Sequence, residues 1–378
     1  MRTRVVSLLP VLAAPALALV IAVVVTSLVL LTAGDPVLLV WHTILSRPDA
    51  RNVVNVINSG AVLYLSGIAA AIGFQMKLFN IGVDGQYRIA AFVAAWVAGE
   101  AWLPGMLNTI VAIMAAVLVG AFWSGIAGLL RVKRGVHEVI STIMLNFVAT
   151  YVVAYLLRNV AVTKGNLIAT KSVPPSGRVP GFSLFPGVPE QIYGLVVLAV
   201  IVGVAYGVML SSTRFGFELR ATGRSSSAAM ASGVSVGRMT VVTLLLSGAV
   251  AGLIGMPLLF GEYYNYGVTF QPGLGFAGIA VALLGRNHPV GVGLGALLFA
   301  YLDEQSNKLQ IFANVSPELV LIIQGVIVMS VVIAYEAVQR YVLHREEKLV
   351  GATVDQDQDE DEGGTPPPGQ GTPQEVRP

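Results

Sequence analysis

The sequence predicts an all-α membrane protein, a polytopic bundle of about ten transmembrane helices with both termini in the cytoplasm. Of its 378 residues, 55% are hydrophobic and only 12% are charged, which is about half the charged fraction of a soluble domain. One globular core cannot hide that much apolar surface, so a lipid bilayer must surround much of it. The net charge of +2 does not suggest a nucleic-acid partner. The lack of cysteine and the spacing of the four histidines predict no metal site.

Apolar segments recur from the first residues to near the C-terminus. The first uncharged run, residues 11–32, is longer than the ~7–15 residues of a signal-peptide core and long enough to cross ~30 Å of hydrocarbon. We therefore expect a retained first helix. The ten predicted spans are 11–33, 56–74, 85–99, 107–130, 138–157, 190–210, 240–260, 273–285, 289–303 and 319–338.

The charges between these segments predict the orientation of the chain. With the N-terminus in the cytoplasm, fifteen Lys and Arg residues lie on the cytoplasmic side and seven on the outer side. Both termini are therefore expected inside, and residues 1–350 form the membrane domain. The remaining residues, 351–378, are acidic and rich in Pro and Gly and lack an apolar face, so we expect them to be disordered.

Two stretches, one at a break between predicted spans and one leading into a span, carry polar groups that lipid cannot satisfy. The stretch "KLFNIGVDGQYRIAA", residues 77–91, holds Asn, Asp and Gln side chains and two glycines that can interrupt a helix. These groups either tie a broken helix together or contact a solute. In the segment 131–157, Glu138, Thr142 and Asn146 are four residues apart and share one helix face. That face serves equally well for hydrogen bonds between helices or for lining a path.

Residues 211–240 are too long for a tight turn between spans. Ser225 or Ser226 is placed to cap a short helix that Gly233 ends. The segment has few large apolar residues to insert into a membrane, and its alanines allow another surface to approach closely. A docking helix for a cytoplasmic protein is therefore favoured over a helix that lies on the bilayer.

A third stretch, residues 261–293, begins with three tyrosines at the level of an outer interfacial belt. It then enters a Gly-rich span and turns at 286–289. This pattern is typical of the close packing and broken helices of transporters.

Four motifs, in order, resemble one known family. "LFNIGVDGQ", "GVHEVISTIMLN", "ELRATGRSSSAAMASGVSV" and "GFAGIAVALLGRNHPVG" are similar to signatures of the permease subunits of ATP-binding-cassette importers for simple sugars, nucleosides and branched-chain amino acids. The resemblance covers roughly residues 56–338 and is greatest to the larger permease of nucleoside importers. The chain departs from the usual pattern at Ser225–Ser227 and at Ala277, where sugar-type members often have Asp.

The resemblance implies a set of partners. A second permease subunit would complete a heterodimer, separate cytoplasmic ATPase subunits would bind ATP and Mg²⁺, and an extracytoplasmic solute-binding lipoprotein would deliver the solute. The host membrane would be the plasma membrane of a prokaryote. The family loop corresponds to residues 214–236, the coupling segment, which would seat on the ATPase. The residues expected to carry this contact are Glu218, Arg220, Ala221, Gly223, Ala228, Ala229 and Gly233.

The expected function is translocation of a nucleoside, most simply a purine nucleoside, by alternating access. The chain contains no G-x-x-x-x-G-K-[ST] pattern, so the ATPase must be another polypeptide and this chain is expected to be no enzyme and to bind no cofactor of its own. The residues expected to face the solute path are Phe79, Asn80, Asp84, Gln86, Glu138, Asn146 and Phe147. The alternatives are a simple sugar such as a pentose as solute, or a secondary transporter driven by an ion gradient through Asp84 or Glu138.

Overall fold

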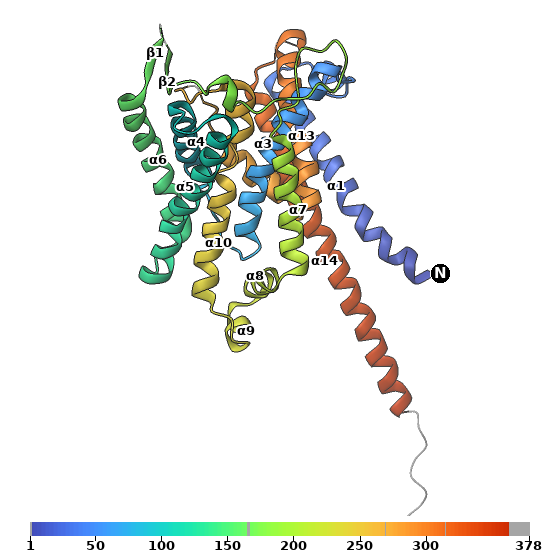
Figure 1. The fold of residues 1–378 in the computed structure, drawn as a ribbon. Coiled ribbons are helices and arrows are strands. Elements are labelled where there is room, and N and C mark those ends of the chain that lie inside the picture. The colour runs from blue at the N-terminus through green and yellow to red at the C-terminus, as the bar shows by residue number, and fades with distance from the viewer. Residues whose placement is uncertain (1, 165–166, 269, 314, 363–378) are drawn as a thin grey trace, which may run out of the picture. The chain divides into compact units, whose positions relative to one another are not determined.

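The computed structural model describes residues 2–164, 167–268, 270–313 and 315–362 (Figure 1). It divides into two units, one of residues 1–23 with 329–378 and one of residues 24–328, and each is described by itself. In the first unit the described residues are helical. They form the beginning of α1 (Arg2–Ala33) and the later part of α14 (Glu318–Glu362).

The second unit holds the other helices and a small hairpin. The helices are α2 (Val37–Ile44), α3 (Ala50–Phe74), α4 (Val83–Glu100), α5 (Gly105–Arg134), α6 (Glu138–Val160), α7 (Val196–Ser212), α8 (Arg214–Arg224), α9 (Ser226–Ala231), α10 (Val236–Ala251), α11 (Met256–Leu258), α12 (Leu274–Leu284) and α13 (Pro289–Ala313). The shorter elements are the strands β1 (Val162–Lys164) and β2 (Leu167–Ala169), the 3₁₀ turn η1 (Pro175–Gly177) and the π-helical turn η2 (Leu259–Tyr263). The strands pair antiparallel, with Val162 opposite Ala169. The prediction of a helical protein is confirmed, and each of the ten predicted segments contains a helix.

The number of membrane crossings is less than the number of helices. Among the described residues, six helices are long and apolar enough to cross a bilayer, or seven if α7 and α8, which meet at a 73° bend, form one span. Helix α12 has 11 residues and is therefore about 16 Å long, half of the ~30 Å hydrocarbon layer. The chain is a multi-pass helical membrane protein, while ten crossings stays a prediction.

Helices α3 and α4 form the centre of the second unit. Helix α3 packs against α10, α12 and α13, and α4 packs against α5 and α6. Most side chains of α3 and α4 are buried, whereas α5 and α6 leave large apolar side chains such as Phe122 and Met144 exposed. Apolar residues on the outside of a helical bundle are what a lipid surrounding favours.

A smaller apolar cluster lies at one edge of the same unit. It combines Leu30 of α1, Val40 of α2, Leu302 and Leu309 of α13 and the first turns of α14. The sequence analysis did not predict α2, because its eight residues are too short for a span. Its packing in this cluster, and a hydrogen bond of 3.0 Å from the Trp41 indole to the Ser27 hydroxyl, explain why this stretch is helical.

Helix α14 extends beyond the predicted membrane domain. It continues to Glu362, into the first residues of the predicted tail. The disorder of residues 351–378 stays a prediction. Extending an existing helix by one residue costs much less than starting one, and Glu and Gln are good helix formers. The rest of the predicted tail, 363–378, lies outside the described residues.

Candidate functional site

The chain between α3 and α4, together with the first turn of α4, forms the polar break, residues 75–86, inside the second unit. Asn80 and Gln86 are fully buried and exchange two amide hydrogen bonds of 3.0 and 2.9 Å. The Asn80 amide also donates to the Ser247 hydroxyl at 2.8 Å, and its carbonyl accepts from the backbone N–H of Gly82 at 3.1 Å. The polar side chains of the break therefore satisfy each other and the freed backbone where the helix is interrupted.

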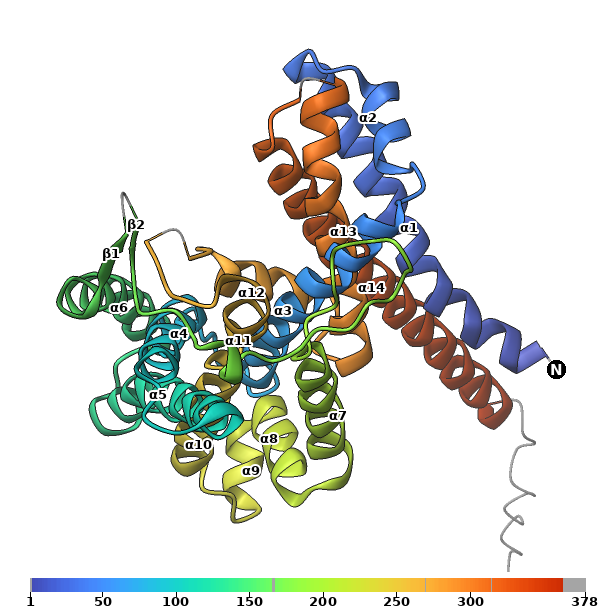
Figure 2. The ribbon, with the colours of Figure 1, turned by 45° about the horizontal axis from the view of Figure 1, so that its top comes forward.

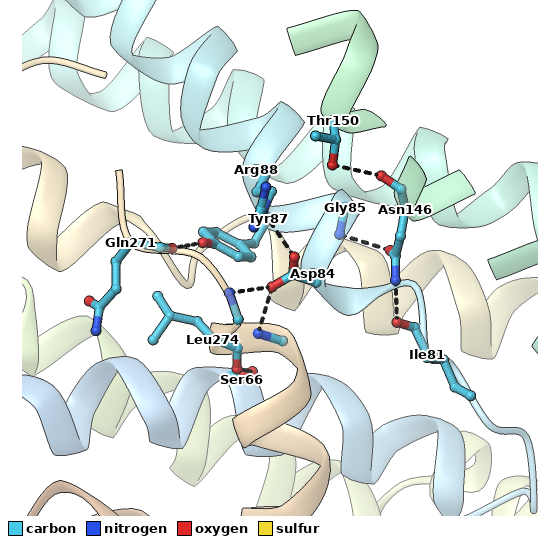
Figure 3. A network of polar contacts seen from close by, with 12 residues as sticks. Ser66, Ile81, Asp84, Gly85, Tyr87, Arg88, Asn146, Thr150, Gln271 and Leu274 are labelled. Atoms are coloured by element: carbon cyan, nitrogen blue, oxygen red, sulfur yellow. Dashed lines mark hydrogen bonds and ion pairs between the residues drawn. The ribbon is translucent and has the colours of Figure 1, made fainter. Parts of the chain in front are cut away.

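Asp84, in the first turn of α4, lies against the N-terminus of α12 (Figure 3). Its Oδ1 accepts hydrogen bonds from the backbone N–H groups of Gly273 at 3.0 Å and Gly275 at 3.3 Å. Its Oδ2 lies 2.9 Å from the Arg88 guanidinium one turn later. The next residue, Tyr87, donates its hydroxyl proton to the Gln271 carbonyl. Side chains from one turn of α4 thus bind the backbone of residues 271, 273 and 275, where α12 begins.

The polar face of α6 packs on the polar break. The Asn146 amide donates to the Ile81 carbonyl at 2.8 Å and its carbonyl accepts from the Gly85 N–H at 2.9 Å (Figure 3). Glu138 is buried, forms an ion pair with Arg131, lies 3.3 Å from Nδ1 of His137, and accepts a long hydrogen bond from the Phe79 N–H. The shared face predicted from the four-residue spacing is confirmed. Its contacts are hydrogen bonds between segments of this chain.

The two aromatic residues predicted to face the path are both partly or largely exposed. Phe79 is half exposed, and its ring centre is 5.1 Å from that of Phe74. Phe147 is exposed on the outer side of α6, beside Tyr151 and Tyr155 on a shallow apolar surface. Phe147 therefore lies away from the hydrogen-bonded groups of the polar break. Contact of any of the seven predicted residues with a solute stays a prediction.

The coupling segment, residues 214–236, forms α8 and α9 at one end of the second unit, and the β1–β2 hairpin lies at the opposite end (Figure 1). Ser225 is the N-cap of α9, and its hydroxyl accepts from the Ala228 N–H at 3.3 Å. Gly233, with φ +84°, follows the end of that helix. The predicted capped helix that Gly233 terminates is therefore confirmed, because capping depends only on local residues.

The predicted contact residues of this segment are partly exposed. Ala228 and Gly233 are exposed, as are the larger Phe217 and Met230, while Ala229 is buried. A cleft of about 450 Å³ lies between α8 and the start of α10. It is lined by Arg214, Phe215, Glu218, Gly233, Val234, Ser235, Arg238, Met239 and Val242. Large apolar side chains beside a cleft with charges of both signs are suitable for binding another protein.

Other residues of α8 contact each other, the end of α7 and the polar break. Glu218 forms an ion pair of 2.7 Å with Arg214, and Arg220 donates to the Leu210 carbonyl at the end of α7. Ala221 is half-buried and Gly223 is buried. A Cβ at Gly223 would lie 2.0 Å from the backbone carbonyl oxygen of Gln75, so only glycine allows α8 to approach the polar break this closely.

A node that the sequence analysis did not identify lies at this contact. The Gln75 amide donates to the Asn287 carbonyl at 3.1 Å and to the Tyr206 hydroxyl at 3.2 Å, and that hydroxyl donates to the same carbonyl at 2.8 Å. The node joins the end of α3, α7 and the turn after α12. One amide, one hydroxyl and one carbonyl at unrelated positions leave no sequence pattern by which to find them.

The opposite end of the unit carries the loop between α6 and α7, which Figure 2 shows running across the unit from β2 to α7. Residues 169–173 pair with the stretch 264–267 through backbone hydrogen bonds such as Val173 N–H to Tyr264 carbonyl at 2.7 Å. At the other end of the loop, burial and the hydrogen bond to the Glu262 carboxylate raise the pKa of Tyr193. The loop is therefore fixed to the residues that precede α12.

Comparison with known proteins gives a consistent assignment. Residues 52–332 match the model of the family described as "Branched-chain amino acid transport system / permease component". The chain is 36% identical to the glucose ABC transporter permease protein TsgB13 of Haloferax volcanii, over 74% of this chain and 75% of that protein. It is 32% identical to the guanosine ABC transporter permease protein NupP of Bacillus subtilis, over 85% and 93%. It is 28% identical to the nucleoside ABC transporter permease protein NupB of Lactococcus lactis, over 76% and 80%.

Proposed function

The chain belongs to the family of branched-chain amino acid transport system permease components, and from this membership we propose that it is the nucleoside-translocating permease of a binding-protein-dependent importer. As a member, it is a multi-pass membrane subunit of an ABC transporter, and a separate ATP-binding subunit hydrolyses ATP. A solute-binding protein is its further partner. The match over residues 52–332, which includes both the polar break and the coupling segment, carries the permease part of the proposal. The similarity to the permeases NupP and NupB, named for guanosine and nucleosides, carries the choice of a nucleoside.

The coupling segment is the proposed seat of the ATP-binding subunit. Its two short helices lie at one end of the unit, where Phe217 and Met230 are exposed and a cleft is lined by charges of both signs. We take this end as cytoplasmic, because the loops that reach it hold most of the Lys and Arg residues. From the distribution of Lys and Arg along the sequence, both termini are proposed to be cytoplasmic. The membrane is proposed to be the plasma membrane of a prokaryote. The loop fixed to 264–267 lies on the outer side, where the solute-binding protein docks.

A second permease subunit completes the proposed path. Two guanosine permeases of Bacillus subtilis, NupP and NupQ, are 32% and 24% identical to this chain. Two nucleoside permeases of Lactococcus lactis, NupB and NupC, are 28% and 26% identical to it. This pairing supports a heterodimer of two different permeases. The path runs through the dimer, and the polar groups of α4 and α6, with Phe79 and Phe147, are its proposed lining when the spans rearrange.

The solute is proposed to be a neutral nucleoside. A nucleoside offers many hydrogen-bonding groups and a flat base, which amide side chains and aromatic rings suit. The guanosine permease NupP and the nucleoside permease NupB align over more of this chain and of their own length than the glucose permease does. The glucose permease has the highest identity of the three, so a sugar is the second candidate.

Uptake by the complete transporter tests the solute. The test uses proteoliposomes that contain the chain, its second permease, its ATPase and its binding protein. ATP is supplied on the side of the membrane where the ATPase lies, and uptake of radiolabelled guanosine, ribose and glucose is compared. We expect guanosine uptake, and we expect unlabelled nucleosides to suppress it while unlabelled ribose does not. Uptake of glucose or ribose without any nucleoside uptake would overturn the solute proposal.

The same vesicles test the energy source. Omitting the ATPase subunit, or replacing ATP by a non-hydrolysable analogue, is expected to abolish uptake, while a proton uncoupler leaves it unchanged. Uptake that persists without ATPase and collapses with the uncoupler would support the secondary transporter, with Asp84 or Glu138 as the intramembrane carboxylate.

A further inference from the structure

The N-terminus of α12 begins inside the second unit and depends on a side chain from another helix. A helix leaves its first four N–H groups without partners, and inside a bundle no bulk water replaces them. The residues at the start of α12 include Gly273, at φ +87°, and Gly275. Both donate to the Asp84 carboxylate, whose position is 189 and 191 residues earlier in the chain. Asp84 is thus the cap of a helix to which it does not belong.

The two helices approach so closely that side chains are excluded at the contact. A Cβ at Gly275 would lie 2.2 Å from the backbone nitrogen of Asp84. At the neighbouring residue, the hydroxyl of Ser66 on α3 donates to the Leu274 carbonyl at 2.7 Å. The start of α12 is therefore fixed in position by backbone contact and by named hydrogen bonds, as Figure 3 shows.

The charge of Asp84 matters as well as its oxygen atoms. Asp84 is 5% exposed and Arg88 pairs with it, so the two charges balance inside the bundle. The carboxylate also lies in the first turn of α4 and at the first turn of α12, where the N-terminal dipoles of both helices favour a negative charge. A neutral residue at position 84 would leave Arg88 beside two positive helix ends.

The other end of α12 is attached to the same stretch of chain. The turn that follows α12 contributes the Asn287 carbonyl, which accepts the hydrogen bond from Gln75. The polar break thus holds α12 at both ends, through Gln75 at its end and Asp84 at its start. Gly223 of the coupling segment packs on the Gln75 carbonyl. A displacement of α8 therefore reaches both ends of α12 through one continuous stretch of residues.

The outer loop reaches the start of α12 from the opposite side. Its residues 169–173 pair with 264–267, where the Tyr266 ring stacks on Phe270 with ring centres 4.8 Å apart. Tyr87 then binds the Gln271 carbonyl two residues before Gly273. The outer loop is thus connected to the stretch before α12, and the coupling segment is connected to Gln75 of the polar break. Asp84 joins the polar break to the start of α12 between these two contacts.

We propose that Asp84 is a positioning residue that joins α12 to α4 and the polar break, so that they move as one body and relay docking at the outer loop to the coupling segment. This inference rests on the proposed function. According to this inference, the factor by which the solute-loaded binding protein stimulates ATP hydrolysis depends on Asp84. Coupling through a chain of contacts requires a functional measurement, because spatial continuity alone does not demonstrate it.

The test compares ATPase stimulation in the complete complex, reconstituted in nanodiscs with its partner permease, ATPase and binding protein. The measured quantity is the ratio of ATP hydrolysis with solute-loaded binding protein to hydrolysis without it. Asp84→Asn keeps the side-chain volume and one acceptor oxygen but loses the charge. It is expected to lower the stimulation ratio by about fivefold or more. Asp303→Asn, which changes a carboxylate that accepts from the Gln324 amide outside this route, is the control and is expected to keep the ratio within about twofold.

Two further variants separate positioning from simple pairing and from misfolding. The exchange Asp84→Arg with Arg88→Asp restores an ion pair but places a cation at the N-terminus of α12, so it is expected not to restore stimulation. Tyr87→Phe removes one hydroxyl and is expected to lower the ratio in a complex that assembles normally, whereas Tyr301→Phe, which loses a hydroxyl bonded to Ile44 and Ser46 carbonyls, is not.

The results have clear consequences. Equal stimulation in wild type, Asp84→Asn and Tyr87→Phe, or full rescue by the charge exchange, would overturn the inference. If the wild-type complex shows neither assembly with the ATPase nor stimulation, the proposed function itself fails. Wild-type stimulation with unchanged variants refutes only the role of Asp84.

Discussion

Replacement of Asn80 by Ala is expected to destabilise the protein more than any exposed substitution. The Asn80 side chain makes four hydrogen bonds, two with Gln86, one with Ser247 and one with the Gly82 N–H. Its removal leaves both amide atoms of Gln86 and the Gly82 N–H buried without partners. Ser247 keeps its hydrogen bond of 2.6 Å to the Ala69 carbonyl.

The magnitude follows from the three orphaned groups. Each buried polar group without a partner costs about 1–3 kcal/mol. Because small shifts of Gln86 restore part of the loss, we expect the free energy of unfolding to fall by about 3–5 kcal/mol. Truncating Gln86 as well removes two of the orphans. A double-mutant cycle should therefore show a coupling energy of about 1–3 kcal/mol between positions 80 and 86.

Equilibrium unfolding in mixed detergent micelles, followed by the fluorescence of the four tryptophans, measures this change. Asn159→Ala is the matched control, because Asn159 lies exposed on α6, where its amide donates to the Tyr155 carbonyl one turn earlier. An Asn80→Ala protein within about 0.5 kcal/mol of the Asn159→Ala protein would refute the reasoning, since it would mean that the buried network contributes nothing.

Three further substitutions test the coupling segment and the outer loop. Ser225→Ala removes the N-cap of α9, a loss of about 1 kcal/mol, and should reduce the amount of ATPase that co-purifies with the chain. Gly223→Val places a Cβ 2.0 Å from a carbonyl oxygen and should lower ATP-driven uptake about tenfold or more, whereas Gly325→Val, which meets open space, should not. Asn58→Ala removes two hydrogen bonds of 2.9 Å to the outer loop and should speed amide hydrogen exchange in residues 186–195. Asn159→Ala is again the control. Unchanged exchange there would show that these bonds do not hold the loop.

Local features of this chain could be predicted from the sequence because local forces produce them. Hydrophobic runs locate the helices, and the four-residue spacing of Glu138, Thr142 and Asn146 places three polar groups on one face whatever lies opposite. Ser225 caps α9 because the cap and its N–H partner are three residues apart. The end of α14 shows the limit of this approach, since composition alone did not indicate that the helix continues to Glu362.

The functional part of the chain required the tertiary structure. The sequence identified Asn80, Asp84 and Gln86 as polar groups that a bilayer cannot leave unpaired, but it did not give their partners. Asp84 binds the N-terminus of a helix about 190 residues later, and Gln75 binds the turn after the same helix. Such contacts depend on how α3, α4 and α12 pack, and no local pattern records that packing. The sequence therefore determined which groups had to be satisfied, and only the fold decided that satisfying them joins the outer loop, the short helix and the coupling segment.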